Sequence, residues 1–185
     1  MKAILLSIKP NWCKLIWSGM KTVEVRKTRP KLETPFKVYI YCSGNSGWLM
    51  MSPKGLLKMD RKVIGEFTCD KIDKLVHVGT MMDINILTLD GWYKPADALL
   101  QAACLTEAQA KKYLKGGDGY GWHISNLKIY DKPVKLKNFW AIQPCTHRGD
   151  CCTCRRWDAK KLICRGEAFG IERPPQSWYY VEDGR

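Results

Sequence analysis

The stretch LLSIKPNWCKLIWSGMKTVEVRK, residues 5–27, carries the strongest structural signal in the chain. It begins inside an apolar run that predicts a buried strand over residues 3–9. Pro10 then favours the start of a short helix, because its fixed φ suits a first helical turn and the next apolar residues recur at helical spacing. Gly19 stands where a helix C-cap requires a left-handed residue. The stretch therefore predicts a strand, a short helix and a sharp return into another extended segment.

That extended segment, residues 22–28, alternates apolar and polar side chains. Val23 and Val25 share one face of the predicted strand, and the opposite face carries Thr22, Glu24, Arg26 and Thr28. We therefore predict a half-buried strand. By spacing alone its charged face has two interpretations: charges that are simply solvated, or a small polar site mounted on a rigid element.

Lys21 lies at the junction between the predicted helix and this strand. Beside Glu24 it would stay charged and bind a phosphate or a carbonyl oxygen, whereas a desolvated lysine near other cations can act as a base or nucleophile. Glu24 and Arg26 can pair with each other or read a base edge together. A carboxylate accepts from an amino group, and a guanidinium binds phosphate or ring acceptors.

The rest of the chain predicts mostly short strands. Strands are expected over residues 36–42, 62–69, 121–130 and 134–136, with a turn at 131–133 and a final short strand after Trp178. Thr106 and Gln109 resemble a capping box that opens a helix ending near Leu114. Residues 77–104 give no clear pattern and are expected to be irregular, with room for short helices. The predicted fold class is α+β and mainly β, a small β-barrel with helices at its ends.

The charge balance indicates the kind of partner. The chain has 31 Lys and Arg residues against 18 Asp and Glu residues, a formal net charge of +13. Within residues 1–31 the only acid is Glu24. Such a surface attracts polyanions, and eight tryptophans and eight tyrosines supply rings on which bases can stack. RNA or a modified nucleoside or nucleotide is the expected partner, the alternative being a basic protein that is merely soluble.

The sequence predicts no membrane span, because no apolar run approaches the roughly 18 residues that a span needs. The apolar part of the amino terminus is too short for a signal peptide. We expect a cytoplasmic protein with no membrane partner.

Five of the nine cysteines fall in one stretch, CTHRGDCCTCRRWDAKKLIC, residues 145–164. In a cytoplasmic chain such clustering favours a metal over disulfides. The two-residue gap between Cys151 and Cys154 lets two thiolates bind one tetrahedral zinc ion. The predicted structural zinc site consists of Cys145, Cys151, Cys154 and Cys164, with His147 or Cys152 as substitutes. A reduced cysteine-rich loop, or disulfides formed on purification, is the alternative.

Four motifs resemble those of the ASCH family, the activating-signal-cointegrator homology domains of the PUA-like superfamily. The first is the opening stretch with its Gly-x-Lys-x-x-Glu-x-Arg pattern, here Gly19, Lys21, Glu24 and Arg26. The others are VIGEF (residues 63–67), GYGWHISNLKIYDKPVKL (119–136) and RPPQSWYYVE (173–182). The last resembles the tail of an ASCH subgroup carried by prophages and Gram-positive bacteria.

The resemblance implies a PUA-like β-barrel with a cleft, beneath the first helix and the motif strand, that holds RNA or a modified nucleoside. It divides the chain into an ASCH domain over residues 1–143, a cysteine-rich zinc-binding insertion over 144–172 and a segment over 173–185 that returns to the barrel. The expected ligand-binding residues are Lys21, Glu24, Arg26, Trp122 and Ser125. Trp122 would supply a stacking ring and Ser125 a hydroxyl, although a core position suits Trp122 equally well.

Three functions fit these observations. The favoured one is an RNA- or nucleotide-binding module that uses the basic cleft. The resemblance also admits an enzyme, either an N4-acetylcytidine amidohydrolase or a ribonuclease, with Lys21 catalytic; in the hydrolase branch, however, a threonine occupies the position of Glu24. The third is a zinc-stapled module whose partner is an unknown protein.

Overall fold

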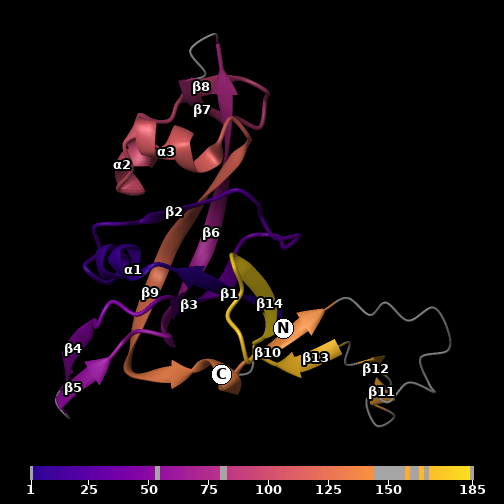
Figure 1. The fold of residues 1–185 in the computed structure, drawn as a ribbon. Helices are drawn as coiled ribbons and strands as arrows, with labels where there is room; N and C mark the ends of the chain where they lie inside the picture. Colours follow the sequence, from indigo (N-terminus) through magenta and orange to yellow (C-terminus); the bar gives the residue numbers. More distant parts are fainter. Residues whose placement is uncertain are drawn as a thin grey trace.

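Strand β1 (Lys2–Ile8) lies in the middle of the sheet that organises the molecule, shown in Figure 1 for the computed structural model. The structure describes residues 2–52, 55–79, 83–143, 157–158, 163–164 and 167–183. Strand β1 pairs in parallel with β3 (Phe36–Cys42) and antiparallel with β14 (Trp178–Glu182). The final described strand of the chain therefore lies beside the first.

The main sheet has ten strands in the order β13–β10–β14–β1–β3–β6–β7–β8, with β9 paired to both β6 and β2. The remaining strands are β2 (Val23–Arg26), β6 (Lys62–Val78), β7 (Asp83–Leu87), β8 (Tyr93–Pro95), β9 (Gly119–Lys135), β10 (Trp140–Gln143) and β13 (Glu167–Gly170). The prediction of a mainly β fold is confirmed. A closed barrel is not formed by the strands that the structure describes, since β13 and β8 remain the two ends of this order.

Short helices and hairpins surround the sheet. They are α1 (Pro10–Trp17), α2 (Asp97–Ala102), α3 (Glu107–Leu114), the 3-10 helix η1 (Leu136–Asn138) and the hairpins β4–β5 (Leu49–Ser52, Gly55–Lys58) and β11–β12 (Trp157–Asp158, Ile163–Cys164). Strands β7 and β8 and helices α2 and α3 gather at one end of the long β6–β9 pair (Figure 1), and we call them the distal lobe. Among the described helices, none combines the length and the apolar character that a membrane crossing requires.

The apolar run in β1 is continuous because the strand is buried on both faces. Ile4, Leu6 and Ile8 pack in a core that also contains side chains of α1. Ala3 and Leu5 point to a second core on the opposite face of the sheet. A strand in this position has no solvent-facing side, so its sequence does not alternate.

The predicted helix ends are confirmed. Helix α1 ends at Trp17, with Ser18 as its C-cap, and Gly19 follows with φ +75°. Helix α3 begins with the predicted capping box, in which Thr106 and Gln109 satisfy each other's free backbone groups. Both signals depend on residues close in sequence, which is why they could be recognised without the fold.

Three sequence predictions were wrong about the extent of regular structure. Strand β6 continues to Val78 and does not end at residue 69. Strand β9 runs from Gly119 to Lys135 without the predicted turn, although its register with β6 shifts there, so that residues 130–133 lie opposite Ile64 alone. Strand β2 pairs with residues 120–123 of β9, far from Pro133, so this proline removes no ladder hydrogen bond to β2. Residues 77–104 are also more regular than predicted, because they contain the end of β6, then β7, β8 and α2.

Candidate functional site

Helix α1 and its C-cap place Lys21 at the entrance to β2. The backbone N–H of Lys21 donates to the carbonyl oxygen of Leu15 at 3.0 Å, which turns the chain back across the end of the helix. The side chain of Lys21 is only 2% exposed. A buried ammonium group requires compensating partners.

Lys21 has three such partners. Its Nζ donates to the carbonyl oxygen of Ala103 at 2.6 Å and lies 3.3 Å from Oε2 of Glu24. The same nitrogen lies 4.9 Å from the centroid of the Trp12 ring, a distance typical of a cation–π contact. Lys21 is therefore held by α1, β2 and the residue that follows α2.

Arg26 approaches Glu24 from the other side. Its Nη2 lies 3.0 Å from Oε1 of Glu24 and donates to the carbonyl oxygen of Ser7 at 2.5 Å. Glu24 thus has one cation at each carboxylate oxygen. The three buried side chains of Lys21, Glu24 and Arg26, which we call the KER triad, carry a net charge of +1.

The KER triad lines a cleft with a volume of about 620 Å³. The cleft is bordered by α1, the start of β2, the distal lobe and the segment before β14, and its lining residues are Ser7, Lys9, Trp12, Lys21, Glu24, Val25, Arg26, Ser43, Leu105, Gln109, Tyr113, Pro174, Pro175 and Gln176. Two buried polar atoms of this lining, Oγ of Ser7 and Nε of Arg26, have no hydrogen-bond partner among the described residues. Both atoms therefore have hydrogen-bonding capacity that the described residues do not use.

The prediction that β2 is half-buried was wrong. All four of its residues are buried, including Glu24 (6% exposed) and Arg26 (8%). The valine face packs against α2 and α3 of the distal lobe, and the charged face is covered by the walls of the cleft. The interpretation of these charges as simply solvated is therefore excluded.

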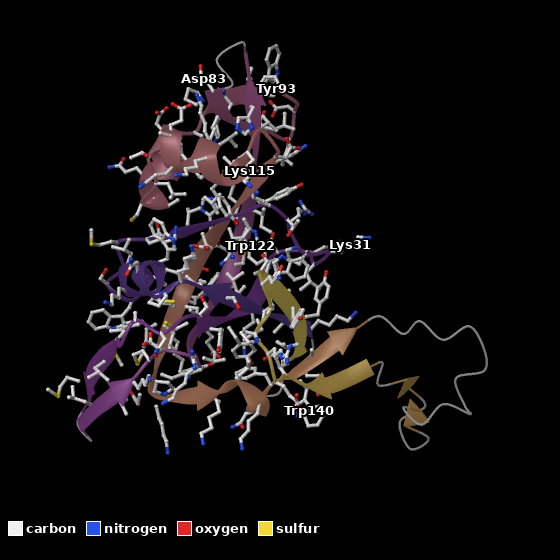
Figure 2. All side chains as sticks on the ribbon, in the orientation of Figure 1. Lys31, Asp83, Tyr93, Lys115, Trp122 and Trp140 are labelled. Atoms are coloured by element: carbon white, nitrogen blue, oxygen red, sulfur yellow. The ribbon has the colours of Figure 1, made fainter. Side chains whose placement is uncertain are left out.

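The other two predicted ligand-binding residues are not part of the cleft lining, although Trp122 lies directly opposite Glu24 across the β2–β9 pair. Trp122 is fully buried, meets Phe36 edge-on at 5.8 Å between ring centroids, and lies within the body of the sheet in Figure 2. The hydroxyl of Ser125 donates to the carbonyl oxygen of Thr68 at 3.0 Å. Neither residue belongs to the described lining of the cleft.

Sequence reasoning did not identify several residues that line the cleft. The helical spacing of α1 predicts only that Trp12 lies on the apolar side of the helix, and the pattern around Gln109 predicts only a capping box. Neither pattern indicates that the residue lines a cleft. Tyr113 and Gln176 come from segments distant in sequence from the motif. For Gln176 the available signal was the RPPQSW tail, which is recognisable as a motif.

The predicted zinc ligands Cys145, Cys151 and Cys154 lie outside the described residues, as do the substitutes His147 and Cys152. Cys164 is placed by its backbone alone, in the two-residue strand β12. In the part of the chain that the structure describes, no three His, Cys, Asp or Glu side chains are grouped as a metal site would require. The zinc site remains a prediction.

Two buried thiols, Cys13 in α1 and Cys69 in β6, lie in environments that disfavour the thiolate. Burial raises the pKa of Cys13, and the neighbouring Cys42 adds to the effect. Burial likewise raises the pKa of Cys69 to about 12. Thiolates are the reactive form of cysteine, so neither group is suited to act as a nucleophile near neutral pH.

Comparison with solved structures identifies the fold. A crystal structure of the ASCH protein from Zymomonas mobilis matches with a TM-score of 0.54 and 17% sequence identity, covering 98% of this chain and 88% of that one. A point variant of the same Zymomonas mobilis protein matches with a TM-score of 0.55 and 17% identity, covering 98% and 89% of the two chains. The chain has an ASCH fold. No family model and no curated protein matches the sequence of this ASCH-fold chain.

Proposed function

We propose that this ASCH-fold protein binds RNA or a nucleotide in the cleft above the KER triad. The observation that carries the proposal is a buried, net positive triad in which Nε of Arg26, like the nearby Oγ of Ser7, has no hydrogen-bond partner among the described residues. A buried donor or acceptor without a partner costs about 1–3 kcal/mol. A ligand that hydrogen-bonds to Ser7 and Arg26 would recover this cost.

The chemistry of the lining supports a nucleotide in particular. The guanidinium of Arg26 and the ammonium of Lys9 are cations that suit a phosphate or a carbonyl oxygen. Trp12 and Tyr113 offer rings on which a base can stack, and the amide groups of Gln109 can read a base edge. The combination of cations, rings and amides around about 620 Å³ fits a nucleotide better than an aliphatic ligand.

The geometry around Lys21 favours binding over catalysis. Its ammonium group is engaged by Ala103 and Glu24, and its remaining side faces Trp12. A general base or nucleophile needs a free nitrogen lone pair directed at the substrate. Lys21 instead supports Glu24 and contributes positive charge to the cleft.

The test uses Ser7→Ala, because the Ser7 hydroxyl has no hydrogen-bond partner in the described part of the protein, so its removal should leave the fold intact. We expect about a tenfold loss of affinity for a fluorescein-labelled RNA and for nucleoside monophosphates, the value of one hydrogen bond made in a buried site. Ser125→Ala, which lies outside the cleft, is the matched control. If Ser125→Ala weakens binding and Ser7→Ala does not, the ligand is not held in this cleft.

The enzyme alternative has its own assay. The protein is incubated with N4-acetylcytidine and with labelled RNA, and products are compared with those of Lys21→Ala. Turnover that depends on Lys21 would replace the binding proposal with a catalytic one. A protein that binds neither RNA nor nucleotides in the preceding assay would instead favour the protein-interaction module.

A further inference from the structure

One series of cross-strand neighbours connects β1 and β3, whose ends border the cleft, with the C-terminal end of β9. Lys9 and Ser43, which line the cleft, directly follow Ile8 in β1 and Cys42 in β3. Ile8 lies opposite Cys42, Cys42 lies opposite Lys62 of β6, and Lys62 lies opposite Lys135 of β9. Neighbouring strands are about 4.8 Å apart, so Lys62 and Lys135 lie roughly 5 and 10 Å beyond β3. Ile8 and Cys42 are buried, so this series gives the spacing of the strands and not an exposed groove.

The last two members of this series, Lys62 and Lys135, belong to a group of basic side chains. Arg61, Lys62, Lys135 and Lys137, which we call the cation row, are brought together where β6 begins and β9 ends. Within the described residues none of the four forms an ion pair, whereas Lys37, Lys71, Lys74 and Lys111 each do.

Asp60 and Glu66, two acids near the cation row, are engaged elsewhere, whereas Asp131 of β9 is exposed and forms no ion pair with a described residue. Asp60 precedes Arg61 but is 2% exposed, and its carboxylate accepts from Ser46 and from the backbone N–H of Trp48. Glu66 accepts from the hydroxyl of Tyr130. The positive charge of the row is therefore not neutralised within the described structure.

Lys62 and Lys135 oppose each other directly, and residues opposed in this way share one face of the sheet. Two like charges in such a pair destabilise an antiparallel sheet. An anion bound between them would remove the repulsion. The like-charge pair is thus a second observation, independent of the cleft, that indicates an anionic partner.

We propose that the partner is a nucleic-acid strand rather than a free nucleoside, with one nucleotide in the cleft and its phosphates continuing along the cation row. The proposal rests on the proposed function for the nucleotide in the cleft. A strand repeats its negative charge every few ångströms and gains affinity by releasing counterions from each phosphate. The cation row supplies positive charges beginning one strand beyond the cleft edge.

The test compares Lys62→Gln/Lys135→Gln with Lys94→Gln/Lys115→Gln. Lys94 and Lys115 are exposed, lie in the distal lobe region and form no ion pair in the described structure, and Figure 2 labels Lys115 there. We expect the first variant to bind a short labelled RNA about tenfold more weakly. The slope of log K against log salt should fall by about 1.4, roughly 0.7 for each phosphate that a lysine no longer neutralises. The control should change neither quantity.

Affinity for nucleoside monophosphates separates this inference from the proposed function. Lys62→Gln/Lys135→Gln should leave it unchanged, because a single nucleotide does not reach the cation row. If RNA affinity and its salt slope are also unchanged while Ser7→Ala weakens both ligands, the cation row is not a binding surface and the cleft is. If neither variant affects either ligand, the proposed function fails as well.

The last part of the test uses vesicles that contain anionic lipid. Like RNA they carry negative charge, but they contain no nucleotides. Binding to vesicles that disappears in Lys62→Gln/Lys135→Gln, with RNA binding retained, would overturn the inference in favour of a membrane surface. The thermal midpoint of each variant shows that it is folded. For Lys62→Gln/Lys135→Gln it should be equal to or above that of the parent, because a like-charge pair has been removed.

Discussion

The ammonium group of Lys21 donates to the carbonyl oxygen of Ala103 at 2.6 Å, between residues that are 82 positions apart. Ala103 is the C-cap of α2, where backbone carbonyls have lost their helical partners and the helix dipole favours a cation. The contact joins the distal lobe to the KER triad. Lys21 therefore contributes to the stability of the fold as well as to the lining of the cleft.

Lys21→Met should destabilise the protein by about 3 kcal/mol, because it leaves the Ala103 carbonyl unsatisfied and removes one of the two cations that compensate buried Glu24. Urea unfolding followed by circular dichroism measures the difference. Lys14→Met, on the exposed surface of α1, is the control and should change stability little. A loss below about 1 kcal/mol for Lys21→Met would show that the contact contributes little to stability.

Gly65→Ala should destabilise the protein by about 2–3 kcal/mol. A Cβ at this position would meet the carbonyl oxygen of Lys128 and the Cα of Ile129, the latter at 3.1 Å, and backbone atoms in a paired strand cannot move aside. Gly170→Ala is the control, since its Cβ would meet no atom of the described structure within 4 Å. Equal midpoints of thermal unfolding for the two variants would contradict this prediction.

Stability should fall as the pH rises above 9, because burial raises the pKa of Cys69 from 9.0 to about 12. Above pH 9 the unfolded chain releases this proton while the folded chain keeps it, so each pH unit favours unfolding by up to about 1.4 kcal/mol. Cys69→Ala should flatten the pH dependence of the unfolding free energy between pH 9 and 12. Cys104→Ala, at a partly exposed thiol, should not.

Lys135→Glu should raise stability by about 0.5 kcal/mol, because it replaces a like-charge pair across β6 and β9 by an opposite-charge pair with Lys62. The same change should weaken RNA binding. Lys137→Glu makes the same change of charge in η1, where no described strand residue lies opposite, and should not stabilise the protein. If Lys135→Glu is more stable but binds RNA as tightly as the parent, the repulsion between Lys62 and Lys135 is real but Lys135 does not contact RNA.

Protein purified without chelator should contain about one zinc ion per chain, held by Cys145, Cys151, Cys154 and Cys164. Elemental analysis measures the metal, and titration with a thiol reagent counts the free cysteines. Cys151→Ser should lose the zinc, whereas Cys104→Ser should retain it. Absence of zinc from the parent protein, with every thiol reactive after denaturation, would contradict the prediction.

Local signals in the sequence were sufficient for part of the fold. The Gly19 cap, the Thr106 capping box and the apolar run of β1 each act over a few neighbouring residues, so they were recognised correctly. The turn predicted at residues 131–133 failed because Pro133 and its neighbours occupy a register shift within β9. Whether residues such as Pro133 end a strand depends on how the neighbouring strand pairs with them. The local sequence pattern carries no information about that neighbour.

The sequence by itself determined that Lys21, Glu24 and Arg26 lie close together, since a helix cap followed directly by a strand leaves them little freedom. Only the tertiary structure decided that they are buried. Burial comes from Ala103, Ser7 and the distal lobe, which approach β2 from distant parts of the chain. Spacing along one strand gives the face on which a side chain lies. Whether that face is excluded from solvent depends on the segments that pack against it. Here those segments come from distant parts of the chain, and they bury Lys21, Glu24 and Arg26 in a cleft.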